Sequence, residues 1–276
     1  MATGFYSTPM NPFGVISILV WLLAAAIWVH NIHFTAYCGA QDFSQIDSHS
    51  DGKSPFAVGI RHLKVTGKKL EASVFYPIDK ETARNDGYWF RNPEKTMDAM
   101  VKVFGPMFNI PWLPRFILRS YTSIRFPITE NADIVAKFAS GQTKMRPIIF
   151  SHGLSGDKTF YTVLYHALAA QGYMVIAVNH QDESCFFTED KDGKEMGFVL
   201  KPFYVEPYRK QQLKTRVDEI VKTREALKEM SFDLHVDLFG AAFPNVKLDM
   251  NELVLAGHSF GSATVIAVAS QLKESE

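Results

Sequence analysis

A serine framed by two glycines is the feature of this 276-residue chain that most clearly suggests chemistry. The pentapeptide GHSFG (residues 257–261) follows a short apolar run and precedes a segment of small residues. That context is typical of a nucleophile elbow, a strained turn that lifts a serine hydroxyl above a sheet. Gly257 and Gly261 are predicted to be needed because larger side chains would collide where strand and helix come close. We predict that Ser259 is a nucleophile; the alternative is a glycine-rich turn whose serine only caps a helix.

Acyl transfer also needs hydrogen-bond donors for the oxyanion, and a second loop can supply one. The apolar run at 147–151 ends in His152-Gly153-Leu154. The backbone N–H of Leu154 could pair with that of Phe260, the residue after the serine. Gly153 would let the loop approach the substrate closely. His152 is a candidate base, although a histidine bonded into its own loop is the alternative, and His258, adjacent to the serine, is expected to point away from it.

The elements that would position these residues form an alternating pattern of strands and helices, which is typical of a parallel sheet. A hairpin of two strands, 58–65 and 70–76, is predicted upstream. The further predicted strands are 147–151, 173–178 and 252–256, and the predicted helices are 159–171, 206–230 and 262–272. Residues 179–201 are expected to be a polar excursion, and the charges of helix 206–230 to form a solvated face.

The composition of the chain argues against nucleic acid and against a cysteine metal site. Lys+Arg and Asp+Glu are equal at 29 each, so no overall field steers the chain toward nucleic acid. The two cysteines, Cys38 and Cys185, lack metal-ligand spacing and are too few for a disulfide framework. A neutral or amphiphilic substrate fits this charge balance better than a polyanion.

The N-terminal segment, residues 1–41, carries no Asp, Glu, Lys or Arg. The apolar run that begins at Phe13 and continues to about Phe34 is close to the roughly 20 residues needed to cross a bilayer. A single N-terminal membrane anchor and a cleaved secretory signal are both open interpretations, and a buried core helix is a third. The protein is accordingly expected to be membrane-associated or secreted.

A second segment, residues 96–126, mixes apolar with basic side chains. An amphipathic helix of that composition can lie in the headgroup region of a membrane. The alternative is a helix that packs on the protein's own core and exposes a basic face. The residues predicted to dock on lipid are Trp112, Leu113, Phe116, Ile117 and Leu118.

Three stretches, PIIFSHGL (147–154), GYMVIAVNHQD (172–182) and GHSFGSATV (257–265), resemble the platelet-activating factor acetylhydrolases. The resemblance implies an α/β-hydrolase fold over residues 42–276, a mostly parallel sheet with flanking helices. It implies a serine esterase that removes an acetyl or a short or oxidised acyl group from the sn-2 position of phospholipids at a membrane or lipoprotein surface, without metal or cofactor. Ser259 would then be the nucleophile, Leu154 and Phe260 the oxyanion donors.

The chain departs from that family in one respect. α/β-Hydrolase triads run in the order Ser, Asp or Glu, then His, yet no His or Asp follows Ser259 here. One interpretation is that the chain is the N-terminal two-thirds of such an esterase, with the C-terminal strands missing and strand 252–256 left at the sheet edge. The others are a non-catalytic membrane-associated relative and an esterase of another α/β-hydrolase family.

Overall fold

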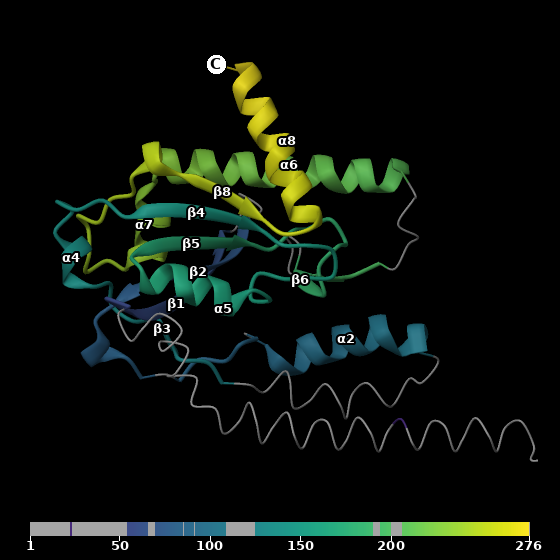
Figure 1. Cartoon of the computed structure of the whole chain (residues 1–276), viewed down its shortest axis with the longest axis horizontal. Helices are drawn as coiled ribbons and strands as arrows, with labels where there is room; N and C mark the ends of the chain where they lie inside the picture. The colour runs from purple at the N-terminus through teal and green to yellow at the C-terminus, as the bar shows by residue number, and fades with distance from the viewer. Residues whose placement is uncertain are drawn as a thin grey trace, which may run out of the picture.

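The computed structural model describes residues 23, 54–65, 70–84, 86–90, 92–108, 125–189, 194–199 and 206–275. Their elements form a six-stranded mixed sheet with helical layers and a separate two-stranded sheet (Figure 1). The strands are β1 (Ala57–Val65), β2 (Leu70–Ile78), β3 (Ile128–Glu130), β4 (Arg146–Ser151), β5 (Tyr173–Val178), β6 (Phe187–Glu189), β7 (Glu195–Gly197) and β8 (Val254–Gly257). The helices are α2 (Pro93–Phe108), α4 (Ala136–Ala139), α5 (Thr162–Ala170), α6 (Glu206–Glu229), α7 (Phe232–Phe239) and α8 (Phe260–Ser275), with short 3-10 turns at Lys80–Thr82 and Met250–Glu252.

The main sheet has the strand order β3-β1-β2-β5-β4-β8. β1 and β2 form an antiparallel hairpin, and β2 pairs antiparallel with β5. β4 then pairs parallel with both β5 and β8. The carboxyl ends of β4 and β8 therefore reach the same edge of the sheet, where the loop after Ser151 meets the turn after Gly257.

Two hydrophobic cores lie on opposite faces of this sheet. Side chains of β4 and β5 alternate between the faces, as the pleat of a strand requires. Ile149 and Ile176 pack with residues of α6, α7 and α8, whereas Phe150 and Val175 pack with α5. Figure 1 shows the same layers, with α6 and α8 on one side of the sheet and α5 on the other. The fold is that of an α/β hydrolase, as predicted.

The predicted strands and long helices agree with these elements to within a few residues. Strand 173–178 matches β5, and helix 206–230 matches α6 almost residue for residue. One expectation is wrong: the charged face of α6 is not wholly solvated, because Arg216 and Glu219 are buried. The excursion 179–201 also contains a small antiparallel hairpin, β6-β7, which was not predicted.

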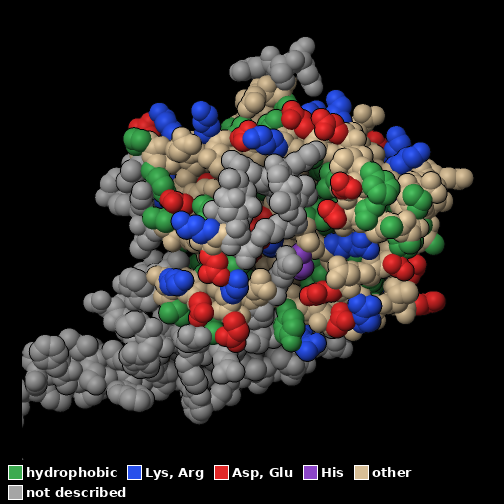
Figure 2. Space-filling model, turned by 180° about the vertical axis from the view of Figure 1, so that it is seen from behind, with side chains coloured by type: hydrophobic (Ala, Val, Ile, Leu, Met, Phe, Trp, Pro, Cys, Tyr) green, Lys and Arg blue, Asp and Glu red, His purple; other side chains and the backbone are tan. Residues whose placement is uncertain are grey.

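β8 lies at the edge of the sheet within the described residues. Apolar side chains are exposed there, with Val254 44% and Ile266 of α8 67% exposed. Elsewhere on the surface, acidic and basic side chains are intermixed, as one face of the molecule shows (Figure 2). That mixture agrees with the formal net charge of +0.

The predictions for the N-terminal segment 1–41 and for lipid docking concern residues that, Leu23 apart, lie outside the described part of the chain. Trp112, Leu113, Phe116, Ile117 and Leu118 are all in that group. Among the helices that the structure does describe, none has both the length and the apolar character needed to cross a membrane.

Candidate active site

Ser259 occupies the sharp turn between β8 and α8. Its φ of 55° lies in the left-handed region that residues other than glycine rarely adopt. The turn brings strand and helix so close that a Cβ on Gly257 would lie 2.5 Å from the Gly261 carbonyl, and one on Gly261 only 2.0 Å from the Ser151 carbonyl oxygen. Both glycines are thus required sterically, and the serine side chain is exposed above them.

The strained backbone predicts a measurable difference between two variants that both lack the hydroxyl. A left-handed conformation costs a residue with a side chain about 1–2 kcal/mol, and glycine avoids this strain. Glycine, however, loses more conformational entropy on folding, which offsets part of the gain. We expect Ser259→Gly to exceed Ser259→Ala in unfolding free energy by about 1 kcal/mol. Urea unfolding of the two variants measures it. An alanine variant as stable as the glycine variant would show that the turn is not strained.

The loop after β4 lies directly against this turn. A Cβ on Gly153 would be 3.2 Å from the Cβ of Ser259 and 3.3 Å from the His258 carbonyl oxygen. The backbone N–H groups of Leu154 and Phe260 have no hydrogen-bond acceptor among the described residues. Both N–H groups are therefore free to bind a ligand, and that of Phe260 lies at the amino end of α8, where the helix dipole favours negative charge.

Tyr161 joins the two segments. The N–H of Gly153 donates to the Tyr161 hydroxyl at 3.2 Å, and that hydroxyl lies 2.9 Å from Nδ1 of His258. With its oxygen already accepting a hydrogen bond, the hydroxyl is suited to donate to Nδ1. The His258 ring is thereby held by Tyr161, and no hydrogen bond joins it to Ser259 within the described residues.

His152 is not free to act on the serine. Its Nδ1 lies 2.7 Å from the Gly153 carbonyl oxygen, and its Nε2 accepts the His180 N–H at 3.3 Å. The ring is fully buried, and burial together with the charge of Arg216 lowers its pKa well below the usual value. His152 therefore has the bonding expected of a histidine that stabilises its own loop.

A buried serine, histidine and glutamate lie in a row beneath the site. Ser151 Oγ is 2.7 Å from Nε2 of His180, whose Nδ1 is 2.6 Å from a carboxyl oxygen of Glu219. Burial raises the pKa of Glu219 to about 8 and lowers that of His180 well below 6.5. The shifts favour a protonated carboxyl group beside a neutral imidazole. Ser151 is fully buried, so this row fixes the ends of β4 and β5 and is not open to substrate.

These shifts predict how stability varies with pH. Glu219 releases its proton near pH 4.5 when unfolded but near 8 when folded, so its contribution is lost as pH rises through that window. His180 acts oppositely, since the folded state binds its proton less tightly and stability falls as pH drops below 6.5. The two effects oppose each other below pH 6.5. Between about 6.5 and 8, Glu219 is the one of the two groups that lowers stability.

At about 1.4 kcal/mol per pH unit, that loss is about 2 kcal/mol over the 1.5 units. We expect Glu219→Gln, which keeps a neutral hydrogen-bonding side chain, to remove this decline. Unfolding free energies of both proteins across the interval measure it. Parallel pH profiles for parent and variant would contradict the assignment of the decline to Glu219.

Sequence reasoning missed a buried ion pair that links α6 to the site. Arg216 Nε donates to Asp182 Oδ2 at 2.7 Å, and both side chains are 0% exposed. Arg216 Nη1 donates to the His152 carbonyl oxygen at 2.6 Å, and its guanidinium lies 4.6 Å from the Phe260 ring centroid. The sequence signal was weak, because a single arginine in a charged helix is usually solvated.

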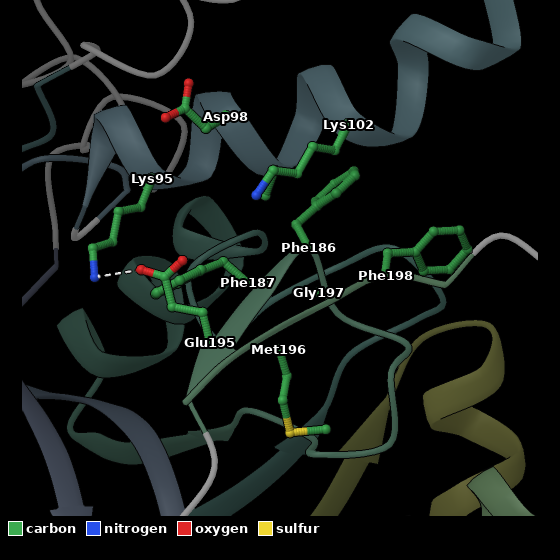
Figure 3. A pocket seen from close by; sticks show the side chains of 10 residues that line it. Lys95, Asp98, Lys102, Phe186, Phe187, Glu195, Met196, Gly197 and Phe198 are labelled. Atoms are coloured by element: carbon green, nitrogen blue, oxygen red, sulfur yellow. Dashed lines mark ion pairs between the residues drawn. The ribbon is translucent and has the colours of Figure 1, made fainter. Parts of the chain in front are cut away.

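A pocket lies between α2 and the β6-β7 hairpin, with a volume near 470 Å³ (Figure 3). Lys95 of α2 is paired with Glu195 of β7 at 2.9 Å, and Lys102 projects from the same helix. Phenylalanine side chains form its apolar side. Phe186 lies 6.3 Å from Phe160, ring centroid to centroid, and Phe160 contacts Tyr161, so aromatic contacts connect the pocket with the serine site.

No group of three possible metal ligands occurs in the described residues.

Comparison with known proteins adds to this geometry. A family model described as platelet-activating factor acetylhydrolase, isoform II, matches residues 42–275. A platelet-activating factor acetylhydrolase of Cavia porcellus is 26% identical over 91% of this chain and 58% of its own length. One of Bos taurus is 28% identical over 80% of this chain and 51% of its own length. The chain thus spans little more than half the length of these relatives.

Among solved structures, a ferulic acid esterase from Streptomyces cinnamoneus matches 79% of this chain and 56% of its own with a TM-score of 0.51. The sequence identity is 16%, so this likeness concerns the fold alone. The match supports the α/β-hydrolase fold described above.

Proposed function

The chain belongs to the platelet-activating factor acetylhydrolase, isoform II, family, and on that premise we propose that it is a serine esterase whose nucleophile is Ser259. The observation that carries the proposal is the strained serine turn with the Gly153 loop packed against it. Both features belong to residues within the matched region. They support a site that combines the Ser259 hydroxyl with two backbone donors.

In the proposed reaction, Ser259 Oγ attacks the carbonyl carbon of an ester, and the carbonyl oxygen becomes an oxyanion. The N–H groups of Leu154 and Phe260 donate to that oxygen, which lies at the amino end of α8. Collapse of the intermediate breaks the bond from the carbonyl carbon to the leaving oxygen. That oxygen takes up the proton lost by Ser259, so the alcohol leaves and the acyl group stays on Ser259. Water then adds to the acyl carbon, which releases the carboxylic acid and restores the Ser259 hydroxyl. The steps use a serine and backbone donors and call for no cofactor or metal.

The general base is not assigned. Serine is a poor nucleophile unless a neighbouring base takes its proton. His152 and His180 are engaged elsewhere, His258 bonds to Tyr161, and these 276 residues contain no histidine after Ser259. An external base such as imidazole is therefore expected to accelerate acylation of this chain.

For the substrate we propose the sn-2 acetyl, or short or oxidised acyl, ester of platelet-activating factor and related phospholipids. Family membership supports this choice, and the balanced charge of the chain suits a zwitterionic or neutral lipid at a membrane or lipoprotein surface better than nucleic acid. Docking through Trp112, Leu113, Phe116, Ile117 and Leu118 is part of the proposal, and so is a location at a membrane or outside the cell.

A second candidate is a non-catalytic relative that binds lipid surfaces. The observation favouring it is that the Ser259 hydroxyl has no hydrogen-bond partner among the described residues, and hence no base in contact. Such a protein would bind phosphatidylcholine vesicles and release no acyl group.

The test uses the full 276-residue chain with ether phospholipids that carry either an acetyl or a long-chain sn-2 ester, each with and without imidazole. We expect acetate release that depends on imidazole, exceeds long-chain release and disappears in Ser259→Ala. Vesicle binding without any release would favour the non-catalytic relative. Equal release of both acyl groups would instead indicate an esterase of different specificity.

A further inference from the structure

The two halves of the proposed oxyanion hole lie in separate segments, the loop after β4 (152–156) and the turn into α8 (258–262), which we call the two loops. Leu154 follows β4 and Phe260 follows β8, and the ladder between these strands ends at the Ser151 and Gly257 pair. The His258 N–H still donates to the Ser151 carbonyl oxygen at 3.2 Å. Beyond that bond, no backbone hydrogen bond joins the two loops within the described residues. Their spacing therefore depends on the close backbone packing at Gly153 and Gly261 and on side chains that bridge the two loops.

Arg216 of α6 contacts both loops at once. Its Nη1 donates to the carbonyl oxygen of His152, two residues before Leu154, at 2.6 Å. Its guanidinium carbon lies 4.6 Å from the centroid of the Phe260 ring, a cation–π arrangement on the residue that offers the other donor. One fully buried side chain thus touches the backbone of one half and the ring of the other.

The guanidinium is itself held in place. Its Nε donates to Asp182 at 2.7 Å, and its Nη2 donates to the hydroxyl of Ser184, which in turn donates to Asp182. The side-chain amide of Gln212 donates to the Asp182 carbonyl oxygen at 2.7 Å. A planar fork with several fixed donors can make these bonds and stack on a ring together, whereas a lysine ammonium cannot.

We propose that Arg216 is a positioning residue that holds Leu154 and Phe260 at the spacing required for oxyanion binding. The inference rests on the proposed function of Ser259. Tyr161 forms a second link on the same two loops, since its hydroxyl contacts both the Gly153 N–H and His258. α6 therefore does more than cover the sheet, because it fixes the geometry of a site to which it contributes no reacting group.

The test compares the full-length parent with Arg216→Lys and Phe260→Leu, and with Arg224→Lys as a matched control on the same helix. One readout is hydrogen exchange of peptides covering 152–156 and 258–262, with β5 as internal reference. The other is labelling of Ser259 by a fluorophosphonate in the presence of imidazole, resolved into the rate at saturating probe and the probe concentration at half-saturation.

For Arg216→Lys we expect faster exchange in both loops with unchanged exchange in β5. We also expect about a tenfold or larger fall in the saturating labelling rate with little change in the half-saturating concentration, because small displacements of catalytic groups cost up to about 100-fold in rate. Arg224→Lys should behave like the parent. Parent-like loop exchange and labelling in Arg216→Lys would overturn the proposal.

Two further outcomes can be told apart: a variant that does not fold and a parent that is not labelled. Where Arg216→Lys does not fold, Phe260→Leu, which removes the ring that Arg216 faces and keeps the backbone N–H, decides the question. The proposal predicts faster exchange in 152–156 as well as in 258–262, and parent-like exchange in 152–156 overturns it. A folded parent that is not labelled at Ser259 counts against the proposed function. In that case loop exchange alone decides whether Arg216 joins the two segments.

Discussion

The Gly261→Ala variant is expected to lose about 3 kcal/mol of unfolding free energy, at the upper end of the usual cost of overpacking. Its Cβ would lie 2.0 Å from the Ser151 carbonyl oxygen and 2.9 Å from that of His152. Both are backbone atoms of the strand end and its loop, so no flexible side chain can move aside. The added methyl group must push α8 away from β4, and urea unfolding measures the cost.

Gly197→Ala is the matched control. Its Cβ would meet a single atom, the Phe186 carbonyl oxygen, at 3.3 Å, in the short hairpin away from the serine turn. We expect a change within about 0.5 kcal/mol, as for other substitutions away from critical contacts. Equal losses in the two variants would show that the close approach of α8 to β4 is not a steric requirement.

The Asp182→Asn variant is expected to lose about 3–5 kcal/mol, the usual cost of breaking a buried ion pair. Asparagine preserves the shape of the side chain but leaves the guanidinium of Arg216 buried without a countercharge, since both side chains are 0% exposed. Unfolding free energies at neutral pH measure the loss. The same substitution should also disturb the loop that follows β5.

An exposed ion pair on α6 provides the control. Asp218 and Lys222 lie 2.6 Å apart, with side chains 59% and 53% exposed. Because exposed pairs contribute about 0–1 kcal/mol, Asp218→Asn should cost no more than about 0.5 kcal/mol. An Asp182→Asn variant as stable as Asp218→Asn would contradict the view that Asp182 stabilises the buried charge of Arg216.

Much of the fold could be predicted because buried parallel strands are short apolar runs with clear ends. Residues 173–178 are an example, bounded by Gly172 and the polar Asn179. The β6-β7 hairpin was missed because its strands have three residues each, too few for a pattern to emerge. Helix α7 was also missed, although Ser231 caps it and Leu234 and Leu238 recur at helical spacing.

The candidate site could also be predicted only in part. Ser259, Leu154 and Phe260 were candidates because the elbow is a local motif with flanking strand and helix. The residues that connect the site to its surroundings could not be inferred from local pattern, since Tyr161, Asp182 and Arg216 meet only after the sheet and α6 have packed. In sequence, Arg216 and Glu219 look like any other charges of a surface helix, and only tertiary structure shows that they are buried.

The central claim, that Ser259 is a reactive nucleophile at the sheet edge, is tested most directly by covalent labelling. The full 276-residue chain is treated with a fluorophosphonate in the presence of imidazole, and the adduct is located by peptide mass spectrometry. We predict an adduct on Ser259 that is absent from Ser259→Ala. An adduct on another serine, or none on a chain shown to be folded, would contradict the claim.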